Sequence, residues 1–175
     1  KMKTDERISL EEKIEGFKRD LYGQRLEVIA FFLDLSPTFN IDNIPFKFKY
    51  AHSVAIHTTD SNYLLYTIGT SSAVDTIWVE KLNTQNLNIK PDLTIEINEI
   101  IRKITVEKGI NEYYYKLILT TDNYEWAFVS ADFYDNEDGT IEYKINDEMI
   151  ISFWDFSDLE EFEKRITDKL IKGKQ

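Results

Sequence analysis

Short apolar runs, separated by turn sequences rich in Thr, Asp, Ser and Asn, fill the middle of the chain and constrain it to a β-rich fold. This pattern predicts β-hairpins, because Asp, Asn and Ser side chains stabilise the chain reversal between two strands. Two hairpins are predicted: residues 53–58 and 63–68 around the turn 59–62, and residues 113–120 and 124–133 around the turn 121–123. Residues 74–82 are expected to form a further strand.

Two more strands are expected closer to the C-terminus. Asp138-Gly139 is a turn sequence, since glycine adopts positive φ without strain, and it leads into residues 141–145. Residues 148–156 carry apolar side chains on both faces, with Met149, Ile151 and Phe153 on one of them. A strand that is apolar on both faces is predicted to lie in the centre of the sheet.

The N-terminal segment has the features of a long helix. Ser9 and Glu12 fit a capping box, in which each side chain accepts a hydrogen bond from a free backbone N–H of the first turn. Apolar residues then recur at helical spacing, and Pro37 cannot continue a helix. We therefore expect a helix over residues 9–35.

Two further helices are expected. Residues 93–108 place apolar side chains on one helical face and end in a basic turn before Gly109. Ser157 and Glu160 repeat the capping box, and a helix from there is expected to run to Gly173. The chain is thus predicted to be an α+β domain with a mainly antiparallel sheet built from hairpins. Its N-terminal, middle and C-terminal helices are expected to pack on that sheet.

The length and composition predict one domain. A chain of 175 residues, 42% of them hydrophobic, can bury a single compact core, and residues 2–173 are expected to form it. Residues 54–60 and 116–122 are similar in sequence, and each precedes a turn. This similarity predicts weakly duplicated hairpin halves over residues 50–82 and 112–145.

The chain contains no cysteine, which excludes disulfides, thiolate metal sites and cysteine nucleophiles. Its polar N-terminus predicts that no signal peptide is present. No apolar run approaches the roughly 18 residues of a membrane span. Together these features predict a cytoplasmic protein that does not contact a membrane.

The net charge of −11 arises entirely from one stretch of the chain. Residues 132–163 hold twelve carboxylates and one base, Lys144, whereas the rest of the chain is balanced. Such a field repels the phosphates of nucleic acids and attracts basic proteins. The alternative interpretation is a solvated surface that serves only solubility.

Acidic and aromatic residues of this stretch form the predicted partner-binding set. The set consists of Asp132, Asp135, Glu137, Asp138, Asp155, Asp158, Glu160, Glu161 and Trp154. Trp is enriched at the centres of protein interfaces when it lies on an exposed face. Trp78, Trp126 and Trp154 lie on predicted strands, and the sequence leaves open which of them belong to the core.

Residues for catalysis, metal binding or cofactor binding are not predicted. His52 and His57 lie an odd number of residues apart on one expected strand, so they should point to opposite faces. The acidic residues before Gly139 do not have the spacing of an EF-hand loop. Nucleophile-elbow, zinc-protease and glycine-rich phosphate-binding motifs are absent from the sequence. We therefore do not expect an enzyme, a metal site or a cofactor.

The expected function is that of an inhibitory or regulatory protein-binding module. Its concrete form is a bacterial immunity or antitoxin-like protein that neutralises a basic partner such as a toxin or nuclease. One alternative is a small-molecule-binding or enzymatic domain with a pocket between the sheet and the apolar loop 36–51. Another is an accessory domain without an activity of its own. The sequence leaves the identity of the partner and the oligomeric state open.

Overall fold

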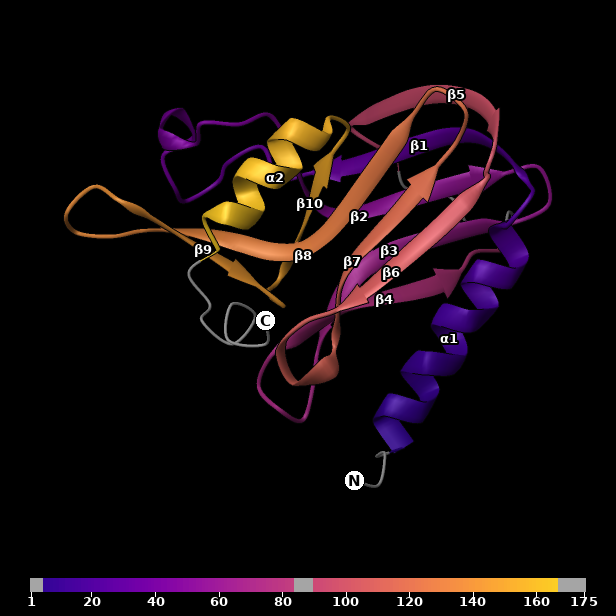
Figure 1. Ribbon diagram of the computed structural model, residues 1–175, viewed down its shortest axis with the longest axis horizontal. Helices are drawn as coiled ribbons and strands as arrows, with labels where there is room; N and C mark the ends of the chain where they lie inside the picture. Colours follow the sequence, from indigo (N-terminus) through magenta and orange to yellow (C-terminus); the bar gives the residue numbers. More distant parts are fainter. Residues whose placement is uncertain (1–4, 84–89, 167–175) are drawn as a thin grey trace.

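The computed structural model describes residues 5–83 and 90–166, and antiparallel strands make up about half of this part of the chain (Figure 1). The strands are β1 (Arg25–Leu33), β2 (Lys49–Thr58), β3 (Asn62–Gly69), β4 (Asp75–Lys81), β5 (Leu93–Ile100), β6 (Lys103–Lys108), β7 (Tyr114–Thr120), β8 (Glu125–Asp135), β9 (Ile141–Ile145) and β10 (Met149–Phe153). The helices are α1 (Asp5–Leu21) and α2 (Phe156–Lys164), with short 3-10 turns η1 (Ile41–Asn43) and η3 (Ile110–Glu112).

The sheet divides at β2. Along one edge, β2 pairs with β1, which in turn pairs with β5. Along the other edge, β2 pairs first with β10, around Ala51, and then with β3, around Val54. One branch of the sheet continues from β3 to β4, and the other continues through β10, β8 and β7 to β6, with β9 on the far part of β8.

The two branches and α1 enclose the first hydrophobic core. In Figure 1, β8, β7 and β6 pass in front of β2, β3 and β4, and α1 lies beside β4. The buried residues of α1 are spaced three or four apart, so they form one apolar stripe facing this core: Leu10, Ile14, Phe17 and Leu21. Ion pairs attach the helix to both branches, Lys13 to Glu80 of β4 and Glu11 to Lys108 of β6.

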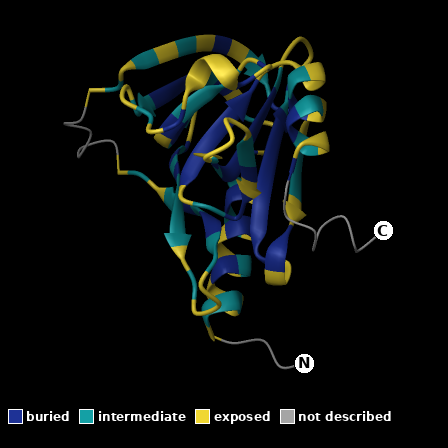
Figure 2. Cartoon of the chain, turned by 90° about the vertical axis from the view of Figure 1, so that its left-hand side faces the viewer, coloured by how far each residue is buried: buried dark blue, intermediate teal, exposed yellow. Residues whose placement is uncertain are grey.

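A second core lies on the outer face of β8, β9 and β10, under α2 and the loop 34–48. Leu159 and Phe162 of α2 and Phe39 and Phe46 of the loop are buried there. The ring of Phe46 contacts several neighbouring rings, and its centroid lies 5.8 Å from that of Phe153. Figure 2 shows the result, with buried strands at the centre and exposed residues at the turns and on the outer sides of the helices.

Asn146, in the turn between β9 and β10, joins three parts of the fold. Its backbone C=O accepts from the N–H of Asp75, and its side-chain NH₂ donates to the C=O of Asp75 at 3.0 Å. Its Oδ1 accepts from the N–H of Ile110 at 2.8 Å, and Asn146 itself is buried with a φ of 54°. The side chain passes so close to Gly109 that a Cβ there would lie 2.5 Å from Oδ1. The amide therefore satisfies backbone groups of β4 and of η3 that would otherwise be unpaired.

The mainly antiparallel sheet and the N- and C-terminal helices are confirmed, but the middle helix is not. Residues 93–108 form β5 and β6 instead. Leu93, Ile95 and Ile97 alternate with polar residues, and this period of two is that of a half-buried strand. The helical spacing within the segment arose because a bulge at Asn98, with a φ of 55°, shifts the alternation.

The predicted N-terminal helix is wrong in its second half. The helix ends at Leu21, and residues 25–33 form β1. Gly23 has a φ of 80°, which ends the helix in the left-handed conformation that glycine adopts without strain. The following run of β-branched and aromatic residues pairs with two strands and is buried through the sheet rather than by one helical stripe.

Both predicted capping boxes are wrong. Helix α1 begins before Ser9, and the N-cap of α2 is Asp155, whose carboxylate accepts from the N–H of Ser157 at 2.9 Å. The expected end of the last helix at Gly173 lies outside the described residues. None of the described helices is long and apolar enough to span a membrane.

The predicted hairpins are present as β2–β3 and β7–β8, and their turns share a hydrogen-bond pattern. Thr58 Oγ1 donates to the C=O of Ser61 and accepts from its N–H, and Thr121 makes the same two bonds with Tyr124. The sequence similarity aligns Thr58 with Thr120, whereas the hydrogen-bond pattern matches Thr58 with Thr121. The duplication of residues 50–82 and 112–145 stays a prediction.

Replacement of Asn146 tests its role as a connector. Asn146→Ala should lower the free energy of unfolding by about 3 kcal/mol, because it leaves buried backbone groups unpaired and places alanine at a positive φ. Asn146→Gly should separate the two effects, since glycine tolerates the φ but loses the same hydrogen bonds. Urea unfolding of both variants gives the measurement.

The control for this experiment is Asn136→Ala in the exposed β8–β9 turn. Asn136 donates to Thr140 Oγ1 at 2.9 Å, so its loss removes one hydrogen bond without burying an unpaired group. Its cost should stay below about 1 kcal/mol. Equal costs for the alanine variants at positions 146 and 136 would contradict the role given to Asn146.

Candidate functional site

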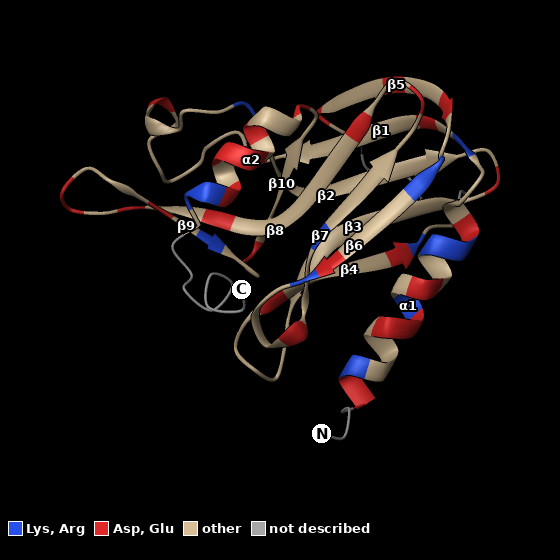
Figure 3. Cartoon of the chain, viewed as in Figure 1, with Lys and Arg blue, Asp and Glu red and all other residues tan. Residues whose placement is uncertain are grey.

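The predicted partner-binding residues lie in three separate places (Figure 3). One group is at the β8–β9 hairpin: Asp135, Glu137 and Asp138. A second is at the end of β10 and along α2: Trp154, Asp155, Asp158, Glu160 and Glu161. Asp132 lies apart from both, on β8. The acidic stretch is therefore one segment of sequence but not one surface.

At the hairpin, two of the three acids stabilise the local fold. The carboxylate of Asp135 accepts from the N–H of Asn40 at 3.1 Å, which holds the loop 34–48 against the body. Asp138 accepts from the hydroxyl and the N–H of Thr140, and these hydrogen bonds lower the pKa of Asp138. Glu137 is exposed at the tip. Neutralising all three acids would therefore disturb the turn as well as remove charge.

Asp132 is half-buried and belongs to a network of tyrosines and acids. Its Oδ1 accepts from the hydroxyl of Tyr50 at 2.6 Å and from the N–H of Phe133 at 2.8 Å. Burial raises the pKa of the Asp132 carboxyl, and the charges of Asp147 and Glu148 raise it further against the opposing effect of these hydrogen bonds. Its side chain thus has a structural role, linking β8 to β2.

The end of β10 and the start of α2 present the largest group of predicted residues on one exposed region. We define the corner surface as Glu125, Trp154, Asp155, Phe156, Asp158 and Glu160. The exposed fraction is 38% for Trp154 and 52% for Phe156. Asp155 lies between them in the chain, and as the N-cap it fixes where the strand ends and the helix begins. Two large aromatic side chains therefore flank a fixed carboxylate.

The three tryptophans divide between core and surface. Trp126 is 4% exposed and contacts Phe31 of β1 at 5.5 Å between ring centroids. Trp154 packs on Trp126 at 5.6 Å, which holds its ring in place while leaving part of it in water. The Nζ of Lys49 lies 5.1 Å from the Trp154 ring, so one edge of the corner surface is basic. Trp78 is half-buried on β4.

Not every acid of α2 is available to a partner. Glu163 accepts from the Nζ of Lys116 at 2.8 Å, and Lys116, which is buried on β7, also pairs with Glu107 of β6 at 2.6 Å. Burial opposes the charge of Lys116, but these two hydrogen bonds outweigh it and raise the pKa of the ammonium group. The ion pair between buried Lys116 and partly exposed Glu163 links α2 to β7 of the sheet.

The remaining acids of α2 differ in whether a basic side chain pairs with them. Glu161 pairs with Arg165 at 3.5 Å. Asp158 and Glu160 form no ion pair with any residue in the described ranges. Their charges are therefore the part of α2 that a basic partner could neutralise.

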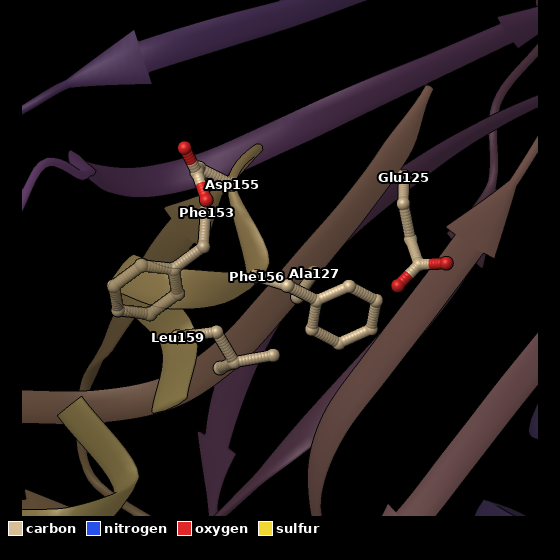
Figure 4. A pocket seen from close by; sticks show the side chains of 6 residues that line it. All are labelled: Glu125, Ala127, Phe153, Asp155, Phe156 and Leu159. Atoms are coloured by element: carbon tan, nitrogen blue, oxygen red, sulfur yellow. The ribbon is translucent and has the colours of Figure 1, made fainter. Parts of the chain in front are cut away.

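A small pocket opens beside the corner surface, between β8, the end of β10 and the start of α2 (Figure 4). Glu125, Ala127, Phe153, Asp155, Phe156 and Leu159 line it. In Figure 4 the Glu125 carboxyl lies beside the ring of Phe156, and Asp155 is on the opposite side. Glu125 was not predicted because it lies outside the acidic stretch 132–163, and Phe156 was not predicted because residues 148–156 were expected to form one strand with apolar residues on both faces. The sequence did contain a signal for Glu125, because this acid directly precedes Trp126.

The space required by the alternative small-molecule function is filled. Phe39 and Phe46 of the loop are buried, with Phe39 4.9 Å from the ring of Phe133. The two histidines make separate contacts and do not form a common site. His57 Nδ1 is 2.9 Å from Asn62 Oδ1, whereas the exposed His52 lies near Asp34 at 3.9 Å. Within residues 5–83 and 90–166, no group of three or more His, Asp or Glu side chains could hold a metal ion.

Comparisons of the chain with protein families, with curated proteins and with solved structures find no match.

Replacing Asp132 tests the physical origin of its raised pKa. Because this pKa lies above its ordinary value, the carboxyl favours folding when protonated, and that contribution is lost as the pH rises through the raised pKa. Asp132→Asn keeps an oxygen for Tyr50 and Phe133 without the charge. The variant should therefore gain stability relative to the unmodified protein as the pH rises from about 4 to about 7.

Urea unfolding at both pH values measures this gain, with Glu137→Gln as the control for a change of one charge at an exposed position. The control should show a smaller dependence on pH, since exposed charges contribute little to stability. An Asp132→Asn variant that is less stable than the unmodified protein at neutral pH would show that the charge is needed for the hydrogen bonds.

Proposed function

We propose that this chain is an inhibitory or regulatory protein-binding module whose corner surface docks on a basic protein. The concrete form of the proposal is a cytoplasmic bacterial immunity or antitoxin-like protein that covers a basic toxin or nuclease. The observation that carries it is the exposure of Trp154 and Phe156 beside Asp158 and Glu160, two acids without ion-pair partners among the described residues.

Aromatic side chains at such a place support binding for an energetic reason. Exposed apolar area costs about 25 cal/mol per Å², so covering two large rings stabilises a complex. Trp is among the residues that dominate measured interface energies. The Trp154 ring is held by Trp126, and α2 is fixed by the Lys116–Glu163 pair, so less conformational freedom is lost on binding.

The charges support fast and selective capture. A surface with an excess of carboxylates accelerates encounters with a basic protein and slows those with acidic ones. An inhibitor of a toxic protein needs a high association rate more than most binding proteins do. The same field opposes contact with nucleic acid, which agrees with a proteinaceous partner.

The alternative of a small-molecule or enzymatic domain has less support. Its pocket was expected between the sheet and the loop 36–51, where Phe39 and Phe46 now fill the space. Catalysis by His52 or His57 would need a partner group, and the two side chains make separate contacts. An accessory domain without activity would share the fold but would not require an exposed aromatic and acidic corner.

Neutralising Asp158 and Glu160 tests the proposal. A photo-reactive residue in place of the exposed Tyr124, next to Glu125 of the corner surface, captures the partner in cells of the source organism, and the partner is then purified. Asp158→Asn with Glu160→Gln should weaken its binding about tenfold, mostly through a lower association rate at low salt. Stopped-flow kinetics at several salt concentrations gives both the rate and its salt dependence.

The matched control is Asp5→Asn with Glu12→Gln on α1, which removes the same charge from exposed positions on another element. If this pair weakens binding as much as the α2 pair, only net charge matters and the corner surface is not the docking site. A partner that is not basic, or an association rate indifferent to salt, would contradict the electrostatic part of the proposal.

A further inference from the structure

A wider depression lies at the C-terminal end of α1, against the turn between β5 and β6. Its volume is about 470 Å³, which is enough space for a small molecule, and it opens widely to solvent. Four of its seven lining residues are basic, although the net charge of the chain is −11. We define the basic depression by these seven residues: Glu15, Lys18, Arg19, Tyr22, Arg102, Lys103 and Ile104.

Backbone hydrogen bonds fix the two elements that supply these cations. Just after α1, the N–H of Gly23 donates to the C=O of Ile101 at 3.0 Å, and the N–H of Ile101 donates to the C=O of Gln24 at 2.8 Å. The N–H of Arg102 donates to the C=O of Thr120 at 2.8 Å, which joins the β5–β6 turn to β7 as well. In Figure 3 the blue end of α1 lies next to the blue start of β6. The fold itself therefore brings the cations together.

Neighbouring acids neutralise only part of this positive charge. Lys103 is exposed and forms no ion pair with any described residue. Lys18 pairs with Glu15 at 3.6 Å, and Arg102 pairs with Asp122 at 3.2 Å. Both pairs face solvent, where an ion pair is weak and an incoming anion competes with it easily. Counting these two acids against the four bases leaves an excess of two positive charges.

The helix end accounts for only some of these cations. Lys18 and Arg19 occupy the last turn of α1, where basic residues interact favourably with the helix dipole. Arg19 also lies back along the helix, since its Nη2 would be 3.5 Å from a Cβ at Gly16. Arg102 and Lys103 belong to no described helix. The negative end of a helix dipole carries about half an elementary charge, which is less than the excess of the basic depression.

Tyr22 adds a flat ring beside the cations. It follows α1 directly and lines the basic depression, and 65% of its surface is exposed. Its N–H donates to the C=O of Lys18 at 3.0 Å, so its backbone continues the helix. Ile104 supplies a further apolar contact. An anionic group and a ring of one ligand can thus be bound side by side.

We propose that the basic depression binds a small phosphate ester that carries an aromatic ring, as a nucleotide does. Lys and Arg bind phosphate through charge-assisted hydrogen bonds, and Arg102 offers it the planar fork of a guanidinium. The ring of the ligand stacks on Tyr22. A nucleic acid is a poorer ligand, because a long polyanion extends into the field of the acidic chain. The site goes beyond the proposed docking function, since none of its residues belongs to the corner surface.

Three probes separate the contributions of the phosphate and the ring. Phenyl phosphate carries both, inorganic phosphate carries the charge alone, and benzyl alcohol carries the ring alone. Backbone amide shifts of residues 18–24 and 101–104 are followed by NMR at low ionic strength during titration of the intact chain. Phenyl phosphate should shift them saturably with a millimolar dissociation constant, as expected for a ligand of few atoms. Inorganic phosphate should bind about fivefold more weakly, and benzyl alcohol should cause no saturable shift. Added salt should weaken the binding of both phosphates.

Two variants remove one contribution each. Lys103→Gln should weaken both phosphates about threefold or more, whereas Lys103→Arg should retain the binding because it keeps the charge. Tyr22→Ser should lower the affinity for phenyl phosphate to that for inorganic phosphate. The matched control is Lys47→Gln, which neutralises an exposed lysine of the loop 34–48 outside the basic depression and should leave both affinities unchanged. Urea unfolding checks that each variant keeps its stability, as expected for exposed positions.

Each contrary result would reject a defined part of the inference. Absence of saturable shifts at residues 18–24 and 101–104 would reject the site. Equal weakening by Lys103→Gln and Lys47→Gln would assign the binding to net charge alone. Equal affinity for the two phosphates would reject the ring contact of Tyr22. A short single-stranded DNA that binds these residues more tightly than phenyl phosphate would replace the small ligand by a nucleic acid. The variants of Asp158 and Glu160 test the docking proposal separately, because they lie outside the basic depression.

Discussion

The pairing of β2 determines the rest of the structure. Ala51 pairs with β1 on one side and β10 on the other, and three residues later Val54 pairs with β1 and β3. A strand has two edges, so β10 and β3 share one edge and the sheet must divide between them. The division places β8 across the first branch, which buries Trp126 and Phe128 inside and leaves the outer face of β8 and β10 to α2. The location of the corner surface follows from this arrangement.

Local chemistry made part of this fold predictable. Turn residues identified both hairpins, and apolar side chains on both faces identified the buried strand β10, because these signals act over a few residues. The segment 93–108 was misassigned because its isoleucines fit both periods, and only the pairing of β5 with β1 decides between them. The end of the first helix at Gly23 was missed because apolar residues continue beyond it towards Pro37. The division of the sheet depends on contacts distant in sequence, which periodicity does not reveal.

The acidic stretch shows why a site is harder to predict than a fold. Its charges were correctly located in the sequence, but the use of each depends on partners far away in the chain. Asp132 meets Tyr50, Asp135 meets Asn40 and Glu163 meets Lys116, so these carboxylates hold the molecule together. Asp158 and Glu160 of α2, which form no ion pair with the described residues, are left near the exposed Trp154 and Phe156. This division supports the proposal that part of the acidic surface binds and the rest stabilises.

Hydrogen exchange of the chain, alone and in complex with the captured partner, tests the central claim most directly. Docking at the corner surface predicts that protection on binding concentrates in residues 153–160 and at the start of β8, because these amides become covered. The loop 34–48, the free edge of β5 and the outer side of α1 should exchange as in the isolated chain. Protection confined to those other regions, with residues 153–160 unchanged, would contradict the account.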